Sequence, residues 1–554
     1  MSDIFILFII ILLKIFLFPT RQSIDFEVHR NLKSITNSLP INQWYFFSEN
    51  KFTLNYPPLF AYMEYFLGKI SHFFDNDITN LKKPNYASNT CKIFMRSAAL
   101  IGDFFLFFSL KKLYKNLNLN LNQYFILLFS VQLNAGLVIA DNINFQYNGI
   151  LFGLLFFSLS FISEKKYILG AIFYFICVGM KQSFLYFAPA YFLFYFQYII
   201  INNIKKKKYK KLIIKSALIL LGLIFVFFIT FLPFIIISFR ENNLSQFIQI
   251  KKRLFPFKSG ILHSHSAPNF WTLYSIVDEL LYFLYYNSEI KINFIDKICN
   301  FLLKYKKYNK NSSSIEDDDM DDLNETEFNF LPEIDIKTTN IIIISFFLIY
   351  FLIFWYKKSS KKKEKNKIKN HKIKELMQHC IFSNLIIFNF GCQINEKDFL
   401  NISLLSLIYY ISFVFIVEKK HKKILSYSDN ITSLALIINF IGVMAQLPSV
   451  NDPKDYLVKI GLTLFYFIYC NIILFNKGDF NSDTETKGLF IFILCIELIL
   501  DFFITFQNYI DFNTEVPGIK ILENLIDRYP SSFSLAYSCI NSVLVQTLML
   551  LLVI

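Results

Sequence analysis

Four residues near the amino terminus bring together side chains that could perform acid–base chemistry. Asp25 and Glu27 are carboxylates, and His29 and Arg30 follow them closely. A carboxylate can take a proton from a hydroxyl group, and a neighbouring cation keeps it ionised and orients it. The two carboxylates share a face in an extended segment but lie about 200° apart on a helix, where one could meet a substrate while the other serves the structure. The simpler alternative is that both only solvate the end of the preceding apolar segment.

Three other groups of residues offer hydrogen bonds, charge or aromatic rings to a substrate. Residues 141–149 carry six polar side chains, more than a turn requires, which suits recognition of hydroxyl groups or phosphate. Arg253 and His263 could supply a cation and an imidazole to an anionic head group, although a histidine in a loop is more often inert. Trp44 and Tyr56 suit an aromatic belt at a membrane interface, with stacking on a sugar ring as the alternative.

Long apolar segments must position these residues. The chain has 554 residues, of which 54% are hydrophobic and 19% aromatic. Apolar runs of about 15 to 25 residues recur along it, and each is long enough to cross a bilayer as a helix. The sequence therefore predicts an all-α polytopic membrane protein. About fourteen spans are expected, at residues 4–18, 94–110, 122–140, 149–162, 167–183, 185–203, 212–238, 338–356, 376–390, 399–417, 425–445, 456–475, 489–510 and 530–554.

Basic loops set the orientation of these spans. The net charge of +14 is concentrated in short connections such as 204–211 and 357–374. Such loops favour the cytosolic side of a membrane, so the charge does not indicate nucleic-acid binding. The opposite side then receives the long loops 19–93 and 239–337, and the acidic insert 309–328 is expected to be disordered. The residues that could do chemistry all fall on that side, although the topology is inferred from the positions of the lysines alone.

Metal and cofactor sites are not indicated by the sequence. The eight cysteines are scattered and form no CxxC or Cys/His pattern, and no phosphate-binding or dinucleotide-binding loop stands out. Lys181 ends an apolar segment, and an ionisable group at membrane depth is a candidate functional residue. We interpret the whole of residues 1–554 as one integral membrane domain.

The segment 25–31 (DFEVHRN) resembles the first lumenal loop of the dolichyl-phosphate-glucose-dependent α-1,3-glucosyltransferases of the endoplasmic reticulum. Further similarities cover most of the chain, and they lie at 56–58 (YPP), 145–148 (FQYN), 188–191 (APAY), 253–257 (RLFPF) and 267–271 (APNFW). Within that family, the sequence motifs FEVHRN at 26–31 and YMEY at 62–65 are similar to those of the branch that adds the second glucose.

The resemblance implies a GT-C fold in the endoplasmic reticulum membrane, with an active site facing the lumen and no metal or cofactor. It implies an inverting transfer of glucose from dolichyl phosphate glucose to a dolichyl-diphosphate-linked oligosaccharide. Asp25 matches the family's general base. Arg253, Lys181, Lys397 and His263 are candidates to offset the charge of the leaving phosphate, and the motif context favours Arg253 and Lys397. The substrate-binding residues expected from the matched motifs are Glu27, His29, Arg30, Trp44, Tyr56, Asp141, Gln146, Asn148, Lys181, Arg253, His263, Asn269, Trp271, Glu396 and Lys397.

Four histidines of the family pattern are replaced here, by Asn142, Asn144, Gln393 and Asn395. An amide can exchange hydrogen bonds but cannot carry a positive charge. A weakly active or non-catalytic paralogue is therefore one alternative, and the enzyme that adds the first glucose is another. A multi-pass transporter is a third, but it should show internal repeats and polar residues through the bilayer midplane, and neither is clear here.

Overall fold

The computed structural model describes residues 3–256, 267–286, 297–304, 330–332, 334–360, 371–414, 437–450, 452–470, 494–502, 504–505 and 537–546. Every regular element in these segments is a helix, which confirms the predicted all-α class. His263 and the acidic insert 309–328 lie outside the described residues. The chain forms two compact units. The first comprises residues 1–255, 366–384 and 400–498, and the second comprises 256–365, 385–399 and 499–554.

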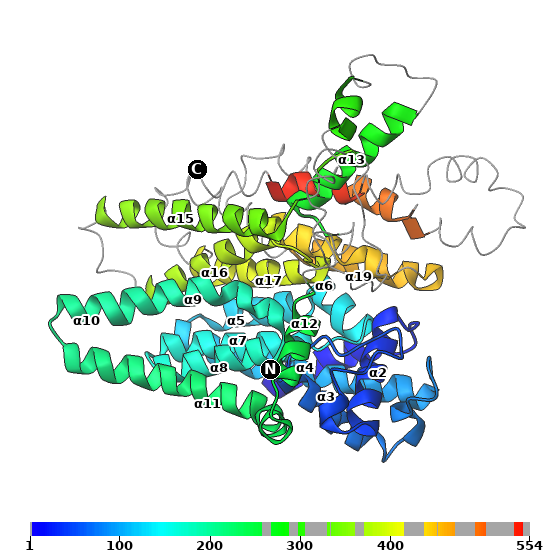
Figure 1. Ribbon diagram of the computed structural model, residues 1–554, viewed down its shortest axis with the longest axis horizontal. Coiled ribbons are helices and arrows are strands. Elements are labelled where there is room, and N and C mark those ends of the chain that lie inside the picture. The colour runs from blue at the N-terminus through cyan, green and yellow to red at the C-terminus, as the bar shows by residue number, and fades with distance from the viewer. Residues whose placement is uncertain are drawn as a thin grey trace, which may run out of the picture. The chain divides into compact units, whose positions relative to one another are not determined.

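A helical bundle forms the body of the first unit. Its helices are α4 (Asn89–Leu117), α7 (Asn148–Ser163), α8 (Tyr167–Met180) and α11 (Tyr209–Glu241), and α4 packs on α7, α7 on α8 and α8 on α11 (Figure 1). Glycines allow α4 and α7 to approach closely. A β-carbon added at Gly153 would lie 2.8 Å from the carbonyl carbon of Phe105, and one at Gly149 would lie 3.0 Å from that of Gly102. Small residues at this spacing are typical of helix contacts inside membranes.

The first helix, α1 (Asp3–Ile15), is fixed to α4 by buried charges. The ammonium group of Lys14 lies 2.5 Å from the carboxylate of Asp103, and both side chains are almost fully buried. The guanidinium group of Arg96 donates to backbone carbonyls that follow α1, at Leu17, Thr20 and Arg21. These contacts give Arg96 and Asp103 a structural role, since each satisfies a group that would be costly to bury alone.

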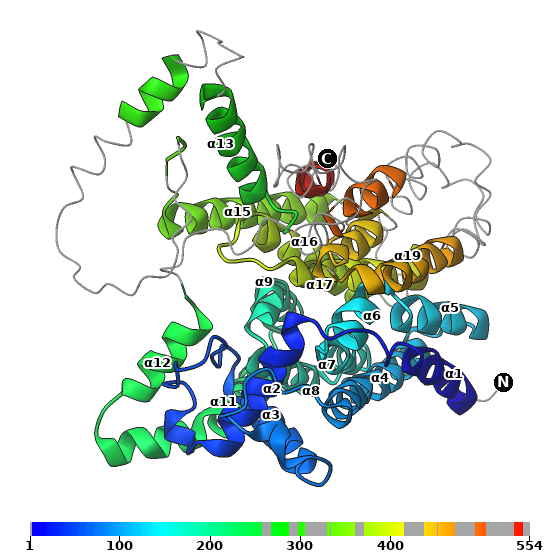
Figure 2. The ribbon, with the colours of Figure 1, turned by 90° about the vertical axis from the view of Figure 1, so that its right-hand side faces the viewer.

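Two helices of the first loop lie across one end of this bundle (Figure 2). They are α2 (Ile24–Ser38) and α3 (Pro58–Ser71), which pack against each other. Pro57 and Pro58 fix the start of α3, because proline is preorganised for the first turn and lacks the N–H that a helix leaves unpaired there. The lysine-rich connection 205–209 lies at the opposite end of the bundle (Figure 1).

The predicted spans 122–140 and 185–203 are not single regular helices. The predicted span 122–140 consists of α5 (Leu121–Gln132) and the segment Ala135–Ile143, which are bent by 43°. The predicted span 185–203 lies in a run in which α-helical turns alternate with 3₁₀ and π turns. Its elements are η4 (Gln182–Phe187), α9 (Ala188–Tyr195), η5 (Phe196–Ile201) and α10 (Asn202–Lys205). Backbone of this kind is tolerated in a membrane where neighbouring helices satisfy its polar groups.

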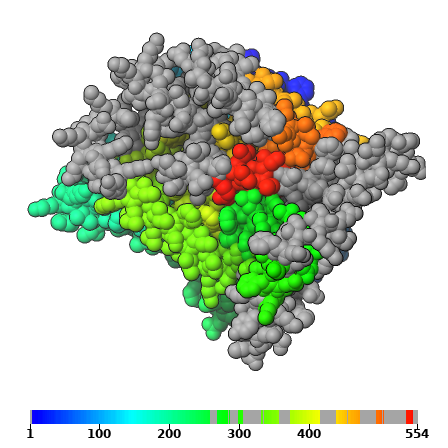
Figure 3. All heavy atoms as spheres, turned by 90° about the horizontal axis from the view of Figure 1, so that it is seen from above, coloured from blue at the N-terminus to red at the C-terminus, as the bar shows by residue number. Residues whose placement is uncertain are grey.

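Later helices complete both units. They are α12 (Ser245–Leu254), α13 (Phe270–Tyr286), α15 (Ile336–Ser360), α16 (His371–Phe390), α17 (Leu400–Tyr409) and α19 (Tyr456–Cys470). The helix α15 belongs to the second unit and lies on the face shown in Figure 3, where it is drawn in light green. Its side chains at Ile341, Leu348 and Leu352 are more than half exposed, which suits contact with lipid.

Four helical stretches of the described residues are long and apolar enough to cross a membrane. They are Asn89–Leu117, Gln182–Lys205, Tyr209–Glu241 and Ile336–Trp355, and the bent pair Leu121–Gln132 with Ala135–Ile143 would make a fifth. Shorter apolar helices occur at Asn148–Ser163, Tyr167–Met180, Ile437–Ser449 and Tyr456–Cys470. The structure therefore supports a membrane protein, and the figure of fourteen spans stays a prediction.

Candidate active site

The helical form of α2 separates the two carboxylates near its start. Asp25 lies in the first turn, where the positive end of the helix dipole favours a negative charge. Its side chain is partly exposed, and its Oδ2 accepts a hydrogen bond of 3.0 Å from Nε2 of Gln146. Glu27 is buried on a different side of the helix. Of the two arrangements open at the sequence level, the structure has the one in which the carboxylates point apart.

Glu27 and Arg30 join α2 to the end of the first loop. The guanidinium group of Arg30 contacts both carboxylate oxygens of Glu27 at 2.6 Å, and Nη1 also donates to the carbonyl of Ile78 at 3.1 Å. Oε1 of Glu27 in turn accepts the backbone N–H of Asn85 at 3.0 Å. A bidentate pair of this kind fixes geometry as well as adding energy. Both residues therefore have structural partners, and their contact with a substrate stays a prediction.

A buried polar cluster lies one helical turn beyond Asp25. Glu64 of α3 is fully buried, and its carboxylate lies 2.8 Å from Nδ1 of His29 and 2.6 Å from Nζ of Lys33. Lys33 also donates to the hydroxyl of Tyr147 at 2.9 Å. Burial raises the pKa of Glu64, but the charge of Lys33 and the hydrogen bond from His29 outweigh it and lower that pKa below its ordinary value. Glu64 is thus ionised at neutral pH and holds α2 against α3.

Sequence reasoning missed this cluster, although it named His29. The available signals were a glutamate in the apolar helix at 58–71 and a lysine four residues after His29, on the same face of α2. Neither signal says that the two meet, because Lys33 and Glu64 are 31 positions apart in sequence.

The hairpin 141–149 forms a chain of hydrogen bonds that ends on Asp25. Asp141 accepts the backbone N–H groups of Asn148 at 3.1 Å and Gly149 at 2.6 Å, and so it caps the start of α7. The side-chain Nδ2 of Asn148 donates to Oδ1 of Asp141 and to Oε1 of Gln146, at 2.9 Å in each case. Gln146 then donates to Asp25. The polar side chains predicted to recognise a substrate are therefore connected to the proposed base.

Lys181 joins the same chain of hydrogen bonds from the end of α8. It follows the last residue of α8, and its ammonium group lies 3.3 Å from Oδ1 of Asn148. A positive charge is thereby linked to Asp25 through two amide side chains. The contact of Lys181 with a substrate stays a prediction.

A later segment packs against the start of α2. The backbone N–H of Arg21 donates to Asp455 at 2.7 Å, and its guanidinium group pairs with Asp452 at 2.8 Å. Asn144, one of the positions that depart from the family pattern, donates to the hydroxyl of Ser449 at 2.7 Å. Both Asn142 and Asn144 are buried. Ser449 thus contacts the hairpin, and Asp452 and Asp455 contact Arg21, contacts that sequence reasoning did not predict.

Trp44, Tyr56 and Arg253 hold the first loop in shape. Trp44 is buried and donates to the carbonyl of Leu39 at 3.1 Å, while the ring of Tyr56 stacks on Phe60 with centroids 4.2 Å apart. Arg253 donates to three oxygens of the first loop, the carbonyls of residues 45 and 47 and the hydroxyl of residue 53. Burial lowers the pKa of Arg253 below its ordinary value. Their contact with a substrate stays a prediction.

The predicted site residues Asn269, Trp271, Glu396 and Lys397 belong to the second unit. Oδ1 of Asn269 accepts the backbone N–H of Thr272 at 3.0 Å and so caps α13. Trp271 is buried and packs against Tyr274 and Leu331. Glu396 and Lys397 lie in the short helix η6 (Glu396–Phe399), in which Glu396 is buried.

No metal site is found within the part of the chain that the structure describes. Among those residues, no group of three or more His, Cys, Asp or Glu side chains is arranged to hold a metal ion. The expectation that the reaction needs no metal or cofactor stays a prediction. What the described site offers is a partly exposed carboxylate, hydrogen-bonding amides and a nearby ammonium group. Such a site can take a proton from a hydroxyl group and balance the charge of an anion.

Comparison with known proteins assigns the chain to a family. Residues 10–552 match the model of the ALG6, ALG8 glycosyltransferase family. A relative from Kluyveromyces lactis is 29% identical over 500 residues, covering 86% of this chain and 80% of the relative, and one from Saccharomyces cerevisiae is 28% identical over 500 residues, covering 86% and 78%. One from Schizosaccharomyces pombe is 39% identical over 275 residues, covering 49% and 52%. All three are named dolichyl pyrophosphate Glc1Man9GlcNAc2 α-1,3-glucosyltransferase. Because the match extends over nearly its whole length, this chain belongs to the ALG6, ALG8 glycosyltransferase family.

Proposed function

We propose that this protein transfers glucose from dolichyl phosphate glucose to the terminal glucose of a monoglucosylated dolichol-linked oligosaccharide, forming an α-1,3 linkage. The observation that carries the proposal is the name shared by the relatives, which specifies an acceptor with one glucose, Glc1Man9GlcNAc2. The segments 26–31 and 62–65, which are similar to the branch adding the second glucose, support the same acceptor.

Asp25 acts as the general base in this proposal. The 3-hydroxyl of the acceptor glucose gives its proton to the Asp25 carboxylate while its oxygen attacks the anomeric carbon of the donor. The bond from that carbon to the phosphate oxygen breaks, the bonding electrons leave with dolichyl phosphate, and the β-linked glucose becomes α-linked. Partial exposure of Asp25 and its hydrogen bond to Gln146 support this role, because a base must be both accessible and oriented.

Lys181 is our preferred cation for the leaving phosphate within the first unit. It reaches Asp25 through Asn148 and Gln146, whereas the guanidinium group of Arg253 donates to three oxygens of the first loop. An ammonium group at this place would stabilise the negative charge that develops as the donor bond breaks. Lys397 and His263 stay candidates from the matched motifs.

The site is proposed to face the lumen of the endoplasmic reticulum. The helices α2 and α3 lie at one end of the bundle, and the lysine-rich connection 205–209 lies at the other (Figure 1). Lysine-rich connections favour the cytosol. The end that carries Asp25 then lies on the lumenal side.

An acceptor competition tests the proposal. Microsomes from cells that lack both family branches, complemented with this chain, receive dolichyl phosphate glucose and equal amounts of unglucosylated and monoglucosylated acceptor. Mass spectrometry of the released glycans should show conversion of the monoglucosylated acceptor to the diglucosylated product. Exclusive use of the unglucosylated acceptor would identify the first-glucose enzyme, and no product from either acceptor would favour the non-catalytic paralogue or the transporter.

A further inference from the structure

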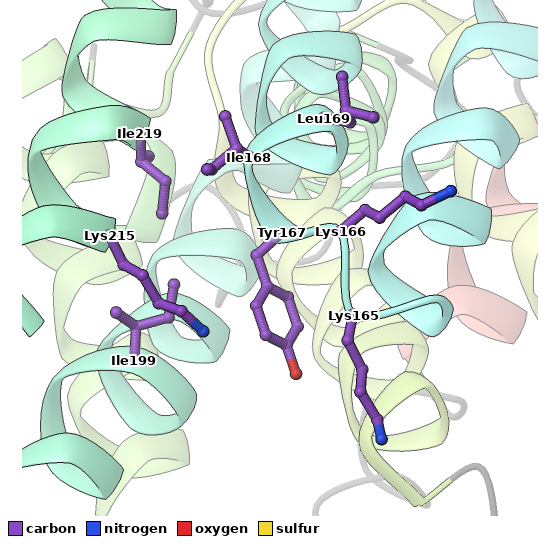
Figure 4. Close-up of a pocket in the computed structure, with 8 residues that line it drawn as sticks. All are labelled: Lys165, Lys166, Tyr167, Ile168, Leu169, Ile199, Lys215 and Ile219. Carbon is purple, nitrogen blue, oxygen red and sulfur yellow. The ribbon is translucent and has the colours of Figure 1, made fainter. Parts of the chain in front are cut away.

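Two adjoining cavities open where the first turns of α8 and α11 lie side by side. One has a volume of about 240 Å³ and is lined by Lys165, Lys166 and Tyr167 at the start of α8 (Figure 4). The other has a volume of about 640 Å³ and is lined by the lysines at 207, 208, 210 and 211 before and within the first turn of α11. Ile168 and Lys215 line both, so the two cavities share a wall. We call them together the lysine cavity.

The lysine cavity gathers positive charge that carboxylates do not neutralise. Among the described residues, none of the six lysines at 165, 207, 208, 210, 211 and 215 forms an ion pair. Glu164 is close to the start of α8, but it pairs with Lys112 at 3.0 Å and with Lys166 at 2.7 Å. Burial raises the pKa of Glu164, yet these two lysines and other donors lower it to about 2.

Aromatic rings hold two of the nearby ammonium groups in place. The ammonium group of Lys215 lies 5.3 Å from the centre of the Tyr167 ring, and that of Lys372 lies 5.8 Å from the same centre. Lys372 also donates to the hydroxyl of Tyr167 at 3.2 Å. Figure 4 shows Lys215 extending from α11 toward Tyr167, with Lys165 and Lys166 beyond that ring. The cations are therefore positioned around a common space rather than spread over a surface.

The walls of the cavity are apolar and lie at the boundary of a membrane span. Ile214 and Leu218 of α11 are 48% and 42% exposed, and Leu169 of α8 is 41% exposed. Beyond its first turns α11 is strongly apolar, and its 33 residues are about 50 Å long. Lysines at the end of such a helix lie at the level of phospholipid head groups, and apolar side chains below them lie at the level of acyl chains.

We propose that the lysine cavity binds an anionic phospholipid, with its phosphate among the lysines and an acyl chain along the wall formed by Ile214 and Leu218. Basic pockets between helix ends on the cytosolic side suit anionic head groups, because charge complementarity and apolar contact act together. The uncapped starts of α8 and α11, with no acidic residue in either first turn, add backbone N–H donors at the same place. This inference concerns the end of the bundle opposite Asp25, so it does not depend on the proposed transfer reaction.

Lipid titration of the full-length protein tests the proposal. The purified protein is titrated with short-chain phosphatidylserine, or with phosphatidylcholine as the neutral probe, and adducts are counted by native mass spectrometry. The double variant Lys165→Gln/Lys215→Gln is compared with Lys165→Arg/Lys215→Arg, which keeps the charge. The matched control is Lys115→Gln/Lys205→Gln, which removes two exposed lysines that do not line the cavity. Thermal unfolding in phosphatidylcholine shows whether each variant is folded.

The expected result is one tightly held phosphatidylserine in the parent protein, the arginine variant and the control. The cavity glutamine variant should bind it about 30-fold more weakly, the loss expected for two lysines near a head group. If the control variant binds phosphatidylserine as weakly as the cavity glutamine variant, the lysines attract the lipid only through the overall positive charge of this side of the protein. That result would overturn the proposal. Equal binding of phosphatidylcholine, unchanged binding by the glutamine variant, or displacement of the lipid by millimolar inorganic phosphate would overturn it as well.

Discussion

Replacing Glu64 with glutamine removes the anion at the centre of the cluster that holds α2 and α3 together. The side chains of Glu64 and Lys33 are both fully buried and their charged atoms lie 2.6 Å apart, with His29 on the other carboxylate oxygen at 2.8 Å. Glutamine has nearly the same shape as glutamate, so the substitution leaves no cavity. It leaves the ammonium group of Lys33 buried without its counter-charge.

The expected loss in the free energy of unfolding is about 3 to 5 kcal/mol, the cost of removing one partner from a buried ion pair. Acid should reveal the same interaction. Because the pKa of Glu64 is lowered by folding, its contribution to stability is fully present above its ordinary pKa in the unfolded chain. The contribution is lost as the pH falls through the lower folded value. The stability of the parent should therefore fall more steeply below about pH 4.5 than that of Glu64→Gln.

Unfolding in mixed micelles with increasing dodecyl sulfate, followed by tryptophan fluorescence, measures this difference. The control is Asp77→Asn, because Asp77 and Lys83 are also 2.6 Å apart but their side chains are 36% and 52% exposed. We expect no measurable change in the control, since exposed ion pairs contribute little. A double variant, Lys33→Met/Glu64→Gln, removes the buried charge altogether and should recover much of the lost stability. Equal effects of Glu64→Gln and Asp77→Asn would refute the reasoning, as would a double variant less stable than Glu64→Gln.

Three further substitutions test other contacts of the first unit. Gly153→Ala should lower the free energy of unfolding by about 1 to 3 kcal/mol, because the added methyl group would lie 2.8 Å from the backbone of Phe105. Gly461→Ala has nothing within 4 Å and should leave that energy unchanged or higher in the same micelle titration. Lys14→Met leaves the buried carboxylate of Asp103 without the cation that lies 2.5 Å away. It should lower the free energy of unfolding by about 3 to 5 kcal/mol in the same titration, and a loss below about 1 kcal/mol would contradict a structural ion pair. Gln146→Leu removes the 3.0 Å hydrogen bond to Asp25 and should reduce kcat about tenfold with little change in the acceptor KM; an unchanged kcat would show that Gln146 does not orient the base.

The sequence predicted the local features of the fold well. The helical class follows from long apolar runs, and the start of α3 follows from Pro57 and Pro58. Sequence reasoning left Asp25 and Glu27 open between an extended and a helical arrangement. The spacing of the side chains alone could not distinguish the two arrangements, because the pairing of Glu27 with Arg30 and Asn85 forms only when the first loop is folded.

Contacts between distant segments were beyond the reach of sequence reasoning. Arg253, whose contact with a phosphate stays a prediction, donates to the first loop across some 200 positions, and no periodicity signals such a pairing. The break in the predicted span 122–140 was missed, although the polar residues Gln132 and Asn134 flank Leu133 there. Asn134, which donates to Asn439 at 2.9 Å, lies at that break, and this hydrogen bond too joins distant segments.

The most direct test of the central claim is single-turnover transfer by the purified Asp25→Asn variant. The enzyme is in excess over labelled dolichyl phosphate glucose, the monoglucosylated acceptor is saturating, and acceptor binding is measured separately without donor. As a general base, Asp25 should contribute about 10² to 10⁴ to the rate. We predict a loss of that size with acceptor affinity nearly unchanged, because asparagine keeps the shape and the hydrogen bond from Gln146. Transfer at the parental rate would contradict the assignment of Asp25 as the base.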